Sequence, residues 1–265
     1  MARIDYHLHT TLCKHAEGSI DQYVMHAVET GLDEIGFADH NPMPRGFDSP
    51  HRMDSSQLDH YWKMVRRAQK AFPQISIKCG LEADYLPGGE AFLKRQVNSY
   101  PFDYIYGSIH FIGDWNFDNP VFVHMWEHHD VDEIYARYFE CLGKLIQSRI
   151  FDIIAHPDLI KKFGHRPKTL DLDSIYQDTC RRLREADMCL EVNTSGLRKP
   201  VGEIYPSARL LECAAKEGVP VVIGSDAHMP SHVGADYDKA AALIKSAGYT
   251  HIQQFSRRRR IPVPL

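Results

Sequence analysis

Residues 3–9 of the chain read Arg-Ile-Asp-Tyr-His-Leu-His. The first five of them form a short run of the kind that favours a β-strand. Side chains alternate between the two faces of a strand, so the spacing of His7 and His9 directs both imidazole rings to the same side. This segment therefore predicts a buried strand whose carboxyl end carries two metal-binding side chains.

The same pattern recurs along the chain, in near-continuous apolar runs typical of a fully buried parallel sheet. We expect seven strands, at Arg3–His7, Glu34–Ala38, Ile75–Glu82, Tyr104–His110, Phe151–His156, Met188–Asn193 and Pro220–Ser225. Helical apolar stripes lie between them, at residues 19–32, 54–72, 131–146, 172–186, 203–217 and 236–247. Alternating strands and helices predict right-handed βαβ units, which form either a barrel or an open doubly wound sheet. If the strands form a barrel, the functional residues are expected at the carboxyl ends of the strands.

Length and charge narrow the class of protein. The 265 residues fit one large domain, residues 1–265. The 31 Lys and Arg against 35 Asp and Glu give a net charge of −4, so no overall basic field favours nucleic acid or a membrane. We interpret the basic run 257–260 as a solvated terminal stretch. The absence of a signal-peptide pattern and of a membrane-spanning apolar run predicts a cytoplasmic protein, and six cysteines without a C-x-x-C pair predict reduced thiols.

The 16 histidines are the unusual feature of the composition, because histidine is the commonest metal ligand. Six of the seven predicted strands end in His, Asp or Glu, and a further histidine follows the first strand. These residues are His7, His9, His15, His40, Glu82, His110, His156, Asp226 and His228, with Asp39 as a further candidate. A lone histidine at a strand end is more often a hydrogen-bonded structural residue than a metal ligand. This many imidazoles and carboxylates at one end of a barrel would be electrostatically unfavourable unless cations lie between them.

The size of this set indicates a cluster of two or three ions, because one catalytic zinc takes only three or four ligands. Mixed imidazole and carboxylate ligands suit Zn, Fe or Mn better than Mg or Ca. Cys13 could be a soft ligand, although a buried thiol is its ordinary interpretation.

The motifs that carry these residues resemble those of the PHP (polymerase and histidinol phosphatase) phosphoesterases. They are DYHLHT at 5–10, ADH at 38–40, GLE at 80–82, SIH at 108–110, AHP at 155–157 and SDAH at 225–228. The resemblance implies an α/β fold, a distorted seven-stranded TIM-like barrel, that holds three divalent transition metal ions. It implies His7, His9, Glu82 and Asp226 on one ion, Glu82, His110 and His156 on the second, and His15, His40 and His228 on the third.

Three longer segments, residues 113–120, 156–164 and 193–206, resemble the monofunctional histidinol-phosphate phosphatases within that family. This resemblance implies hydrolysis of L-histidinol phosphate to L-histidinol and phosphate in histidine biosynthesis. It also implies that Arg198 binds the substrate phosphate and places Lys161 at a second phosphate-binding position. The insert 113–130 is expected to form a wall or lid of the active site.

The mechanism that we expect is an in-line attack on phosphorus by a hydroxide that bridges two ions. The third ion and Arg198 neutralise the phosphoryl oxygens. Asp226 and His228 are the candidate catalytic residues. Either a metal-bound water or His228 released from its metal could protonate the leaving group.

Several alternatives stay open at this point. A PHP phosphodiesterase or exonuclease would share the metals but needs an open basic groove. The same metal ligands would also be present in a phosphatase that acts on another small phosphoester, or in a metal-binding protein without enzymatic activity. A metal-dependent amidohydrolase lacks support, because no bridging lysine is evident. The sequence leaves open whether the chain forms a homo-oligomer.

Overall fold

The computed structural model describes residues 2–44 and 47–265. Its central sheet has seven parallel strands in the order β1-β2-β3-β4-β7-β8-β9. They are β1 Ile4–Leu8, β2 Glu34–Phe37, β3 Ser76–Asp84, β4 Tyr104–Ser108, β7 Ile153–Ile154, β8 Cys189–Asn193 and β9 Val221–Gly224. All seven strands predicted from the sequence are present, with bounds that differ by a few residues.

The sheet is curved into a nearly closed barrel, because its first and last strands meet. The His9 backbone N–H donates to the Ala227 carbonyl, and the Ala227 N–H donates to the His7 carbonyl, both at 3.0 Å. Below this contact the buried Asp5 carboxylate accepts the backbone N–H groups of Ser225 and Gly234, each at 2.8 Å. The barrel alternative is therefore confirmed over the open sheet.

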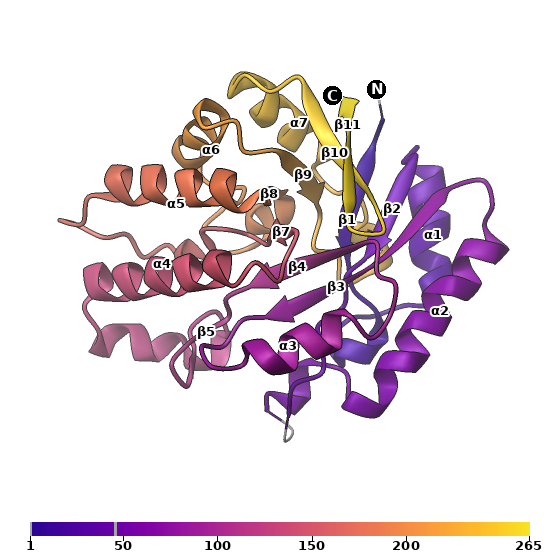
Figure 1. Cartoon of the computed structure of the whole chain (residues 1–265), viewed down its shortest axis with the longest axis horizontal. Coiled ribbons are helices and arrows are strands. Elements are labelled where there is room, and N and C mark those ends of the chain that lie inside the picture. The colour runs from indigo at the N-terminus through magenta and orange to yellow at the C-terminus, as the bar shows by residue number, and fades with distance from the viewer. Residues whose placement is uncertain (1, 45–46) are drawn as a thin grey trace.

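Helices surround the barrel (Figure 1). They are α1 Ile20–Glu29, α2 Leu58–Ala71, α3 Glu90–Val97, α4 Val131–Ser148, α5 Leu172–Ala186, α6 Ala208–Lys216 and α7 Tyr237–Ser246. The short α3 was not expected. The helix expected at 203–217 begins only at Ala208, because Tyr205 instead pairs with Asn193 in an antiparallel bridge.

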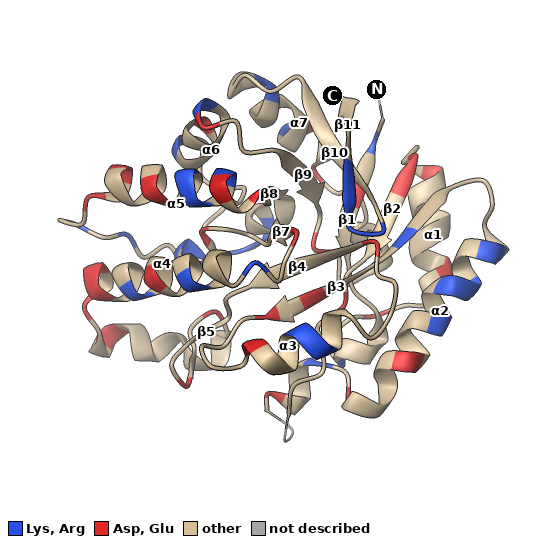
Figure 2. Cartoon of the chain, in the orientation of Figure 1, with Lys and Arg blue, Asp and Glu red and all other residues tan. Residues whose placement is uncertain are grey.

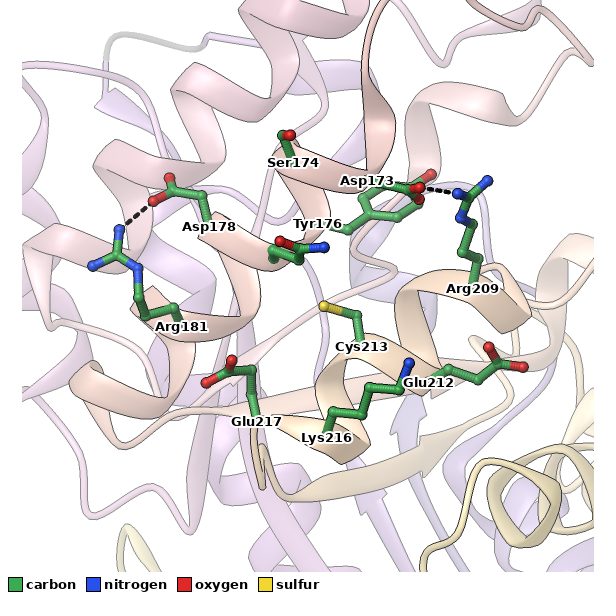
Figure 3. A pocket seen from close by; sticks show the side chains of 11 residues that line it. Asp173, Ser174, Tyr176, Asp178, Arg181, Arg209, Glu212, Cys213, Lys216 and Glu217 are labelled. Atoms are coloured by element: carbon green, nitrogen blue, oxygen red, sulfur yellow. Dashed lines mark hydrogen bonds and ion pairs between the residues drawn. The ribbon is translucent and has the colours of Figure 1, made fainter.

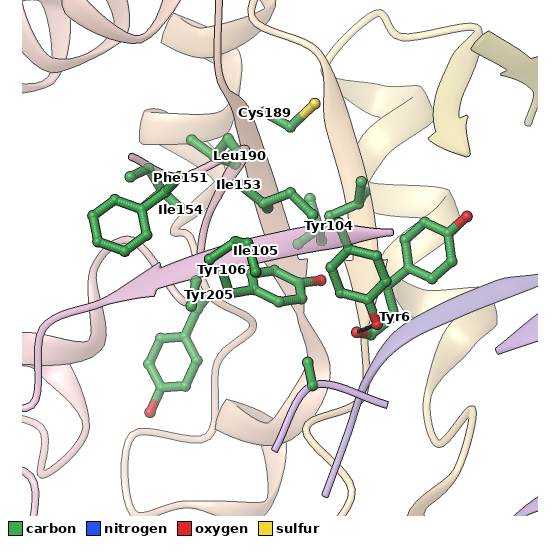
Figure 4. Packing of buried hydrophobic residues seen from close by; sticks show 14 of the residues in the cluster. Tyr6, Tyr104, Ile105, Tyr106, Phe151, Ile153, Ile154, Cys189, Leu190 and Tyr205 are labelled. Atoms are coloured by element: carbon green, nitrogen blue, oxygen red, sulfur yellow. Dashed lines mark hydrogen bonds between the residues drawn. The ribbon is translucent and has the colours of Figure 1, made fainter. Parts of the chain in front are cut away.

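Aromatic side chains fill the barrel interior below the strand ends (Figure 4). The rings of Tyr6 and Tyr104 stack with their centroids 4.9 Å apart, and the Tyr104 hydroxyl donates to the Tyr6 carbonyl at 2.7 Å. Gly36 and Gly80 on the neighbouring strands leave room for this ring, since a Cβ on either would lie 2.1 or 2.3 Å from Tyr104 atoms. The barrel is a packed core, so a ligand can enter only at its ends.

A C-terminal hairpin, β10 His251–Ser256 and β11 Arg259–Pro264, covers the amino-terminal end of the barrel. The Phe255 N–H donates to the Tyr6 hydroxyl at 2.8 Å. Arg258 pairs with Asp152 and Arg260 pairs with Asp187, two acidic residues that lie one and two positions before β7 and β8. The prediction of a solvated stretch at residues 257–260 is therefore wrong for Arg258 and Arg260, which attach the hairpin to the barrel, whereas Arg257 and Arg259 are exposed as expected. Figure 2 shows the basic residues of this hairpin in blue.

Within the described residues, no helix has the length and apolar character needed to cross a membrane. The six cysteines are all free thiols, as expected.

Candidate metal centre

The carboxyl ends of the strands bring the predicted ligands around one buried carboxylate, Glu82 of β3. On Oε2, the neighbours are His40 Nδ1 at 2.9 Å, His7 Nε2 at 3.3 Å and His9 Nε2 at 3.6 Å. On Oε1, they are His156 Nε2 at 3.0 Å and His110 Nε2 at 3.6 Å. Glu82 therefore lies at the centre of five imidazole rings.

The remaining predicted ligands extend this cluster towards the first loop. His9 Nε2 lies 3.2 Å from Asp226 Oδ1, and the rings of His9 and His228 stack at 3.9 Å. His15 lies 4.6 Å from His228 and 5.4 Å from His40, measured between ring centroids. The structure thus brings all nine predicted residues together.

Four sets of side chains within the described residues place ligand atoms within 4.8 Å of one another, as a metal ion requires. They are His7 with His9 and Glu82, His15 with His40 and His228, His40 with Glu82 and His110, and His9 with Cys13 and His228. The first set is part of the ligand group that the family resemblance implies for one ion, and the second is the whole group that it implies for another. The third set combines residues that the resemblance assigns to different ions. The last set includes Cys13, whose thiol is buried beside His9.

Unpartnered polar atoms show that cations fit this cluster. His7 Nε2, His9 Nε2, His228 Nε2 and Glu82 Oε2 are buried and make no hydrogen bond to a described residue. His40 Nδ1 also makes none, although it lies only 2.9 Å from Glu82 Oε2. Buried polar atoms are nearly always satisfied, so lone pairs that face each other without a donor indicate a place for a metal ion.

A second layer of carboxylates faces the outer nitrogens of the histidines. Glu191 Oε1 lies 2.6 Å from His7 Nδ1, Asp84 contacts His110 Nδ1, and Asp39 Oδ1 lies 3.4 Å from His9 Nδ1. Asp39 also accepts the backbone N–H groups of Thr10 and His40, so its oxygens serve the protein rather than the cluster centre. Such outer carboxylates fix the orientation of metal-binding histidines.

Sequence analysis missed Glu191, Asp84 and the buried Arg52, which lies 2.6 Å from Asp84. For Glu191 the available signal was an acidic residue inside an otherwise apolar strand. Asp84 lies two residues after Glu82, at the end of the same strand, beyond the bounds predicted for it. Arg52 follows β2 in a loop, and its partner is 32 residues away in sequence.

Burial and mutual charge shift the ionisation of the central groups. Burial raises the pKa of Glu82, but the surrounding histidines, His40 and His7 first, lower it well below its ordinary value. Burial likewise opposes ionisation of Asp226, yet His7, His9 and His228 hold its pKa well below the usual range. Burial, with the charges of His40 and His9, lowers the pKa of His15 to about 4. The two carboxylates are therefore ionised and His15 is neutral near pH 7, the states in which these groups bind metal. Burial lowers the pKa of His7 and His9, but neighbouring carboxylates raise it well above the ordinary value, so metal binding at these two histidines displaces protons.

A cavity of about 550 Å³ opens above the cluster. Residues 116 and 118–120 of the insert form part of its wall, whereas Trp115 and Trp126 of the same insert pack against each other, 5.2 Å apart. Arg198 lines the cavity, and its guanidinium donates to the Ser225 carbonyl at 2.6 Å. Lys162 and Lys199 also line it, so three cationic side chains stand beside the cluster on this side.

The second predicted phosphate-binding residue, Lys161, is placed differently. Its ammonium group is buried and lies 2.8 Å from the Ile204 carbonyl, 3.0 Å from Asp158 and 3.2 Å from Glu203. It is not among the residues that line the cavity. A buried cation that already has three acceptors does not fit a phosphate-binding role. The neighbouring Lys162 lines the cavity, but its ammonium group is paired with Asp118 at 2.9 Å.

A second hollow, of about 640 Å³, lies between α5 and α6 on the outer side of the barrel (Figure 3). Its charged side chains pair with one another, Arg181 with Asp178 and Arg209 with Asp173. None of the nine predicted ligands lines it. The cavity above the histidine cluster is therefore the candidate functional site.

This fold and cluster define the class: a β/α-barrel protein with a metal-ligating centre at the end where barrel enzymes carry their active sites. The family model of the PHP domain matches residues 5–195, and the chain belongs to this family. It is 41% identical to a probable histidinol-phosphatase of Deinococcus radiodurans over 246 residues, which cover 92% of this chain and 93% of that protein. It is 27% identical to the histidinol-phosphatase of Lactococcus lactis, with 97% and 95% of the two chains covered.

The solved structures that resemble this chain have the same fold. One is the crystal structure of histidinol phosphate phosphatase from Lactococcus lactis in complex with zinc, L-histidinol and phosphate, with a TM-score of 0.83, 24% identity and 98% of each chain covered. Another is the histidinol phosphatase, described as putative, of Listeria monocytogenes, with a TM-score of 0.80, 24% identity, and 89% and 99% of the two chains covered. These matches confirm the predicted seven-stranded PHP barrel.

Proposed function

We propose that this chain is a metal-dependent phosphomonoesterase that hydrolyses L-histidinol phosphate to L-histidinol and phosphate in histidine biosynthesis. The observation that carries the proposal is the cluster of unpartnered imidazole and carboxylate atoms around Glu82, beneath a cavity that Arg198 lines. The 41% identity to a probable histidinol-phosphatase along nearly the whole chain supports the choice of substrate.

The residues fit three divalent ions, Zn, Fe or Mn. Glu82 would contribute to two of the ion sites, since His7 and His9 approach its Oε2 while His110 and His156 approach its Oε1. Asp226 joins His7 and His9 on the first ion. His15, His40 and His228 hold the third, with the His15 Nδ1–H donating to the Cys13 carbonyl at 2.8 Å and its Nε2 left to bind metal.

Bound divalent ions supply Lewis acidity: they neutralise phosphoryl oxygens and make water a competent nucleophile near neutral pH. Arg198 provides a guanidinium donor in the cavity, whose planar fork matches two phosphoryl oxygens at once. The Ser225 carbonyl accepts from Arg198 and holds the side chain in this orientation. The positive charge of Lys199 adds to the attraction for an anionic substrate, whereas the charge of Lys162 is balanced by Asp118, which lies 2.9 Å away.

Two residues are proposed to act next to the reacting phosphoryl group. Ser195 Oγ donates to Asp226 Oδ2 at 3.1 Å, so Asp226 Oδ1 remains directed at His9. His228 follows Asp226 by two positions and is partly exposed to the cavity, so it would be placed to protonate the leaving oxygen if it were released from its metal.

The shape of the site favours a small monoester over a nucleic-acid strand. Residues 116 and 118–120 form a wall on one side of the cavity, whereas a nuclease needs a groove through which a strand passes. A cavity of about 550 Å³ is in the range that holds one small ligand.

Phosphate release by the metal-loaded protein tests the proposal. The substrates are L-histidinol phosphate, p-nitrophenyl phosphate as a generic monoester, and a nucleotide diester, with metal content measured on the same samples. Selective turnover of histidinol phosphate is expected. Turnover of the diester alone would refute the assignment, and equal turnover of both monoesters would leave only the phosphomonoesterase class.

A further inference from the structure

None of the nine candidate ligands comes from β8, yet β8 carries a fully buried carboxylate, Glu191. It lies between Leu190 and Val192, which are also buried. A buried carboxylate costs free energy unless its oxygens are paired, so the partners of Glu191 indicate what it does.

The two oxygens of Glu191 serve two different candidate ligands. Oε1 lies 2.6 Å from His7 Nδ1 on β1, and Oε2 accepts the backbone N–H of His156 at 2.7 Å. The Asn193 side chain donates to Oε2 as well, at 3.0 Å. One carboxylate therefore holds the ring of one histidine and the main chain of another.

The main chain of His156 needs such a contact. Its φ of 25° lies at the left-handed side of conformational space, which residues other than glycine rarely adopt. The N–H group of His156 points at Glu191 in this conformation. Loss of the acceptor would leave a buried N–H without a partner and remove one restraint on the position of the His156 ring.

His7 and His156 reach Glu82 from its two sides. His7 Nε2 lies 3.3 Å from Oε2, and His156 Nε2 lies 3.0 Å from Oε1. When His7 Nδ1–H donates to Glu191, the lone pair of Nε2 is free to face Glu82. Glu191 thus acts at once on the two histidines that flank Glu82.

The neighbouring strand is shaped around the same carboxylate. Gly224 of β9 lies against it, and a Cβ at this position would lie 2.1 Å from Glu191 Oε1 and 2.7 Å from the His7 Cβ. The space that a side chain of β9 would fill is thus occupied by the contact between Glu191 and His7.

We propose that Glu191 is a positioning residue that couples two parts of the metal centre, by setting the tautomer of His7 and the backbone conformation of His156. The inference rests on the proposed function, because it assumes that these histidines bind metal. It assigns to Glu191 an effect on metal affinity, with its effect on turnover as the consequence.

The test is Glu191→Gln, which keeps the shape of the side chain but offers one acceptor oxygen for the three N–H groups of His7, His156 and Asn193. Either His7 Nδ1–H or His156 N–H then faces an amide NH₂ group. We expect the affinity for Zn²⁺ or Co²⁺, measured by competition with a chelator, to fall about 10–100-fold. The visible absorption spectrum of the Co²⁺-loaded protein should change, and kcat should fall more than KM rises.

Glu34→Gln is the matched control. Glu34 is a buried carboxylate at the opposite end of the barrel, where it accepts from Tyr6 and Ser76. It should lower thermal stability while metal affinity stays at the wild-type value. Wild-type metal affinity in Glu191→Gln would overturn the inference alone, whereas a wild-type protein that binds no metal would overturn the proposed function.

A measurement on the wild-type protein covers the case in which Glu191→Gln does not fold. Long-range ¹⁵N–¹H correlation spectra of the zinc-loaded protein report which ring nitrogen of each histidine carries the proton. His7 is expected to carry it on Nδ1, and a proton on Nε2 of His7 would overturn the proposal.

Discussion

Two cations that are 37 positions apart in sequence provide a sharp test of how the substrate phosphate is held. Arg198 lines the cavity and directs its guanidinium towards the strand ends, whereas Lys161 is buried with three acceptors around its ammonium group. Arg198→Ala and Lys161→Met should therefore have opposite signatures. The first should impair substrate binding, and the second should impair stability.

The expected magnitudes follow from these contacts. A hydrogen bond to a charged group contributes about 1.5–3 kcal/mol, so Arg198→Ala should raise KM by about 10- to 150-fold. Lys161→Met leaves Asp158 buried without its cation, which costs about 3 kcal/mol and should lower Tm by about 6–12 °C. Steady-state kinetics and thermal unfolding on both variants separate the two effects. The reasoning is refuted if Lys161→Met keeps its Tm and raises KM, because Lys161 would then bind the phosphate.

Further predictions concern the metal centre, the core and the base of the barrel. His7→Ala should abolish both turnover and metal retention, and near-normal turnover would contradict the proposed cluster. Treatment with a chelator should abolish turnover until a divalent transition metal is added back, with activity and metal content measured together; activity that persists in metal-free protein would be the contrary result. Gly80→Ala places a Cβ 2.3 Å from Tyr104 and should destabilise the fold by about 1–3 kcal/mol, measured by denaturant unfolding. Arg258→Ala removes the pairing with Asp152 and should lower stability by about 1 kcal/mol while kcat is unchanged; an altered kcat would mean that the hairpin reaches the active site.

The alternating pattern of the sequence predicted βαβ units but not whether they form a barrel or an open sheet. The His, Asp and Glu residues at the strand ends, together with the resemblance to the PHP family, favoured the barrel and identified the nine side chains at its mouth. The strands are short, apolar and bounded by polar residues, and parallel strands must present their carboxyl ends on one side. The positions of His7, Glu82 and Asp226 at those ends therefore determined that they would meet.

The hairpin at residues 251–264 could not be predicted in the same way. Its stability depends on Asp103, Asp152 and Asp187, which lie far away in sequence and come together only at the amino-terminal end of the finished barrel. A run of arginines that pairs with distant acidic residues has the same local sequence as a run that is exposed to solvent, so the sequence alone does not distinguish the two.

The outer carboxylates and the orientation of Lys161 were missed for a related reason. Whether Glu191 faces the metal centre depends on the neighbouring strand, where Gly224 leaves room for it. Lys161 and Lys162 are adjacent, and the short 3₁₀ helix Leu159–Lys161 decides which of them faces the cavity. Neither choice has a signature within the local sequence.

The most decisive measurement of the metal centre is a crystal structure of the protein grown with Zn²⁺, with anomalous data collected on both sides of the zinc absorption edge. Three anomalous peaks are expected around Glu82, with His7, His110 and His15 each bound to a different one at about 2.0–2.1 Å. Diffraction data that contain no such peak, in crystals whose histidine rings still converge on Glu82, would contradict this expectation.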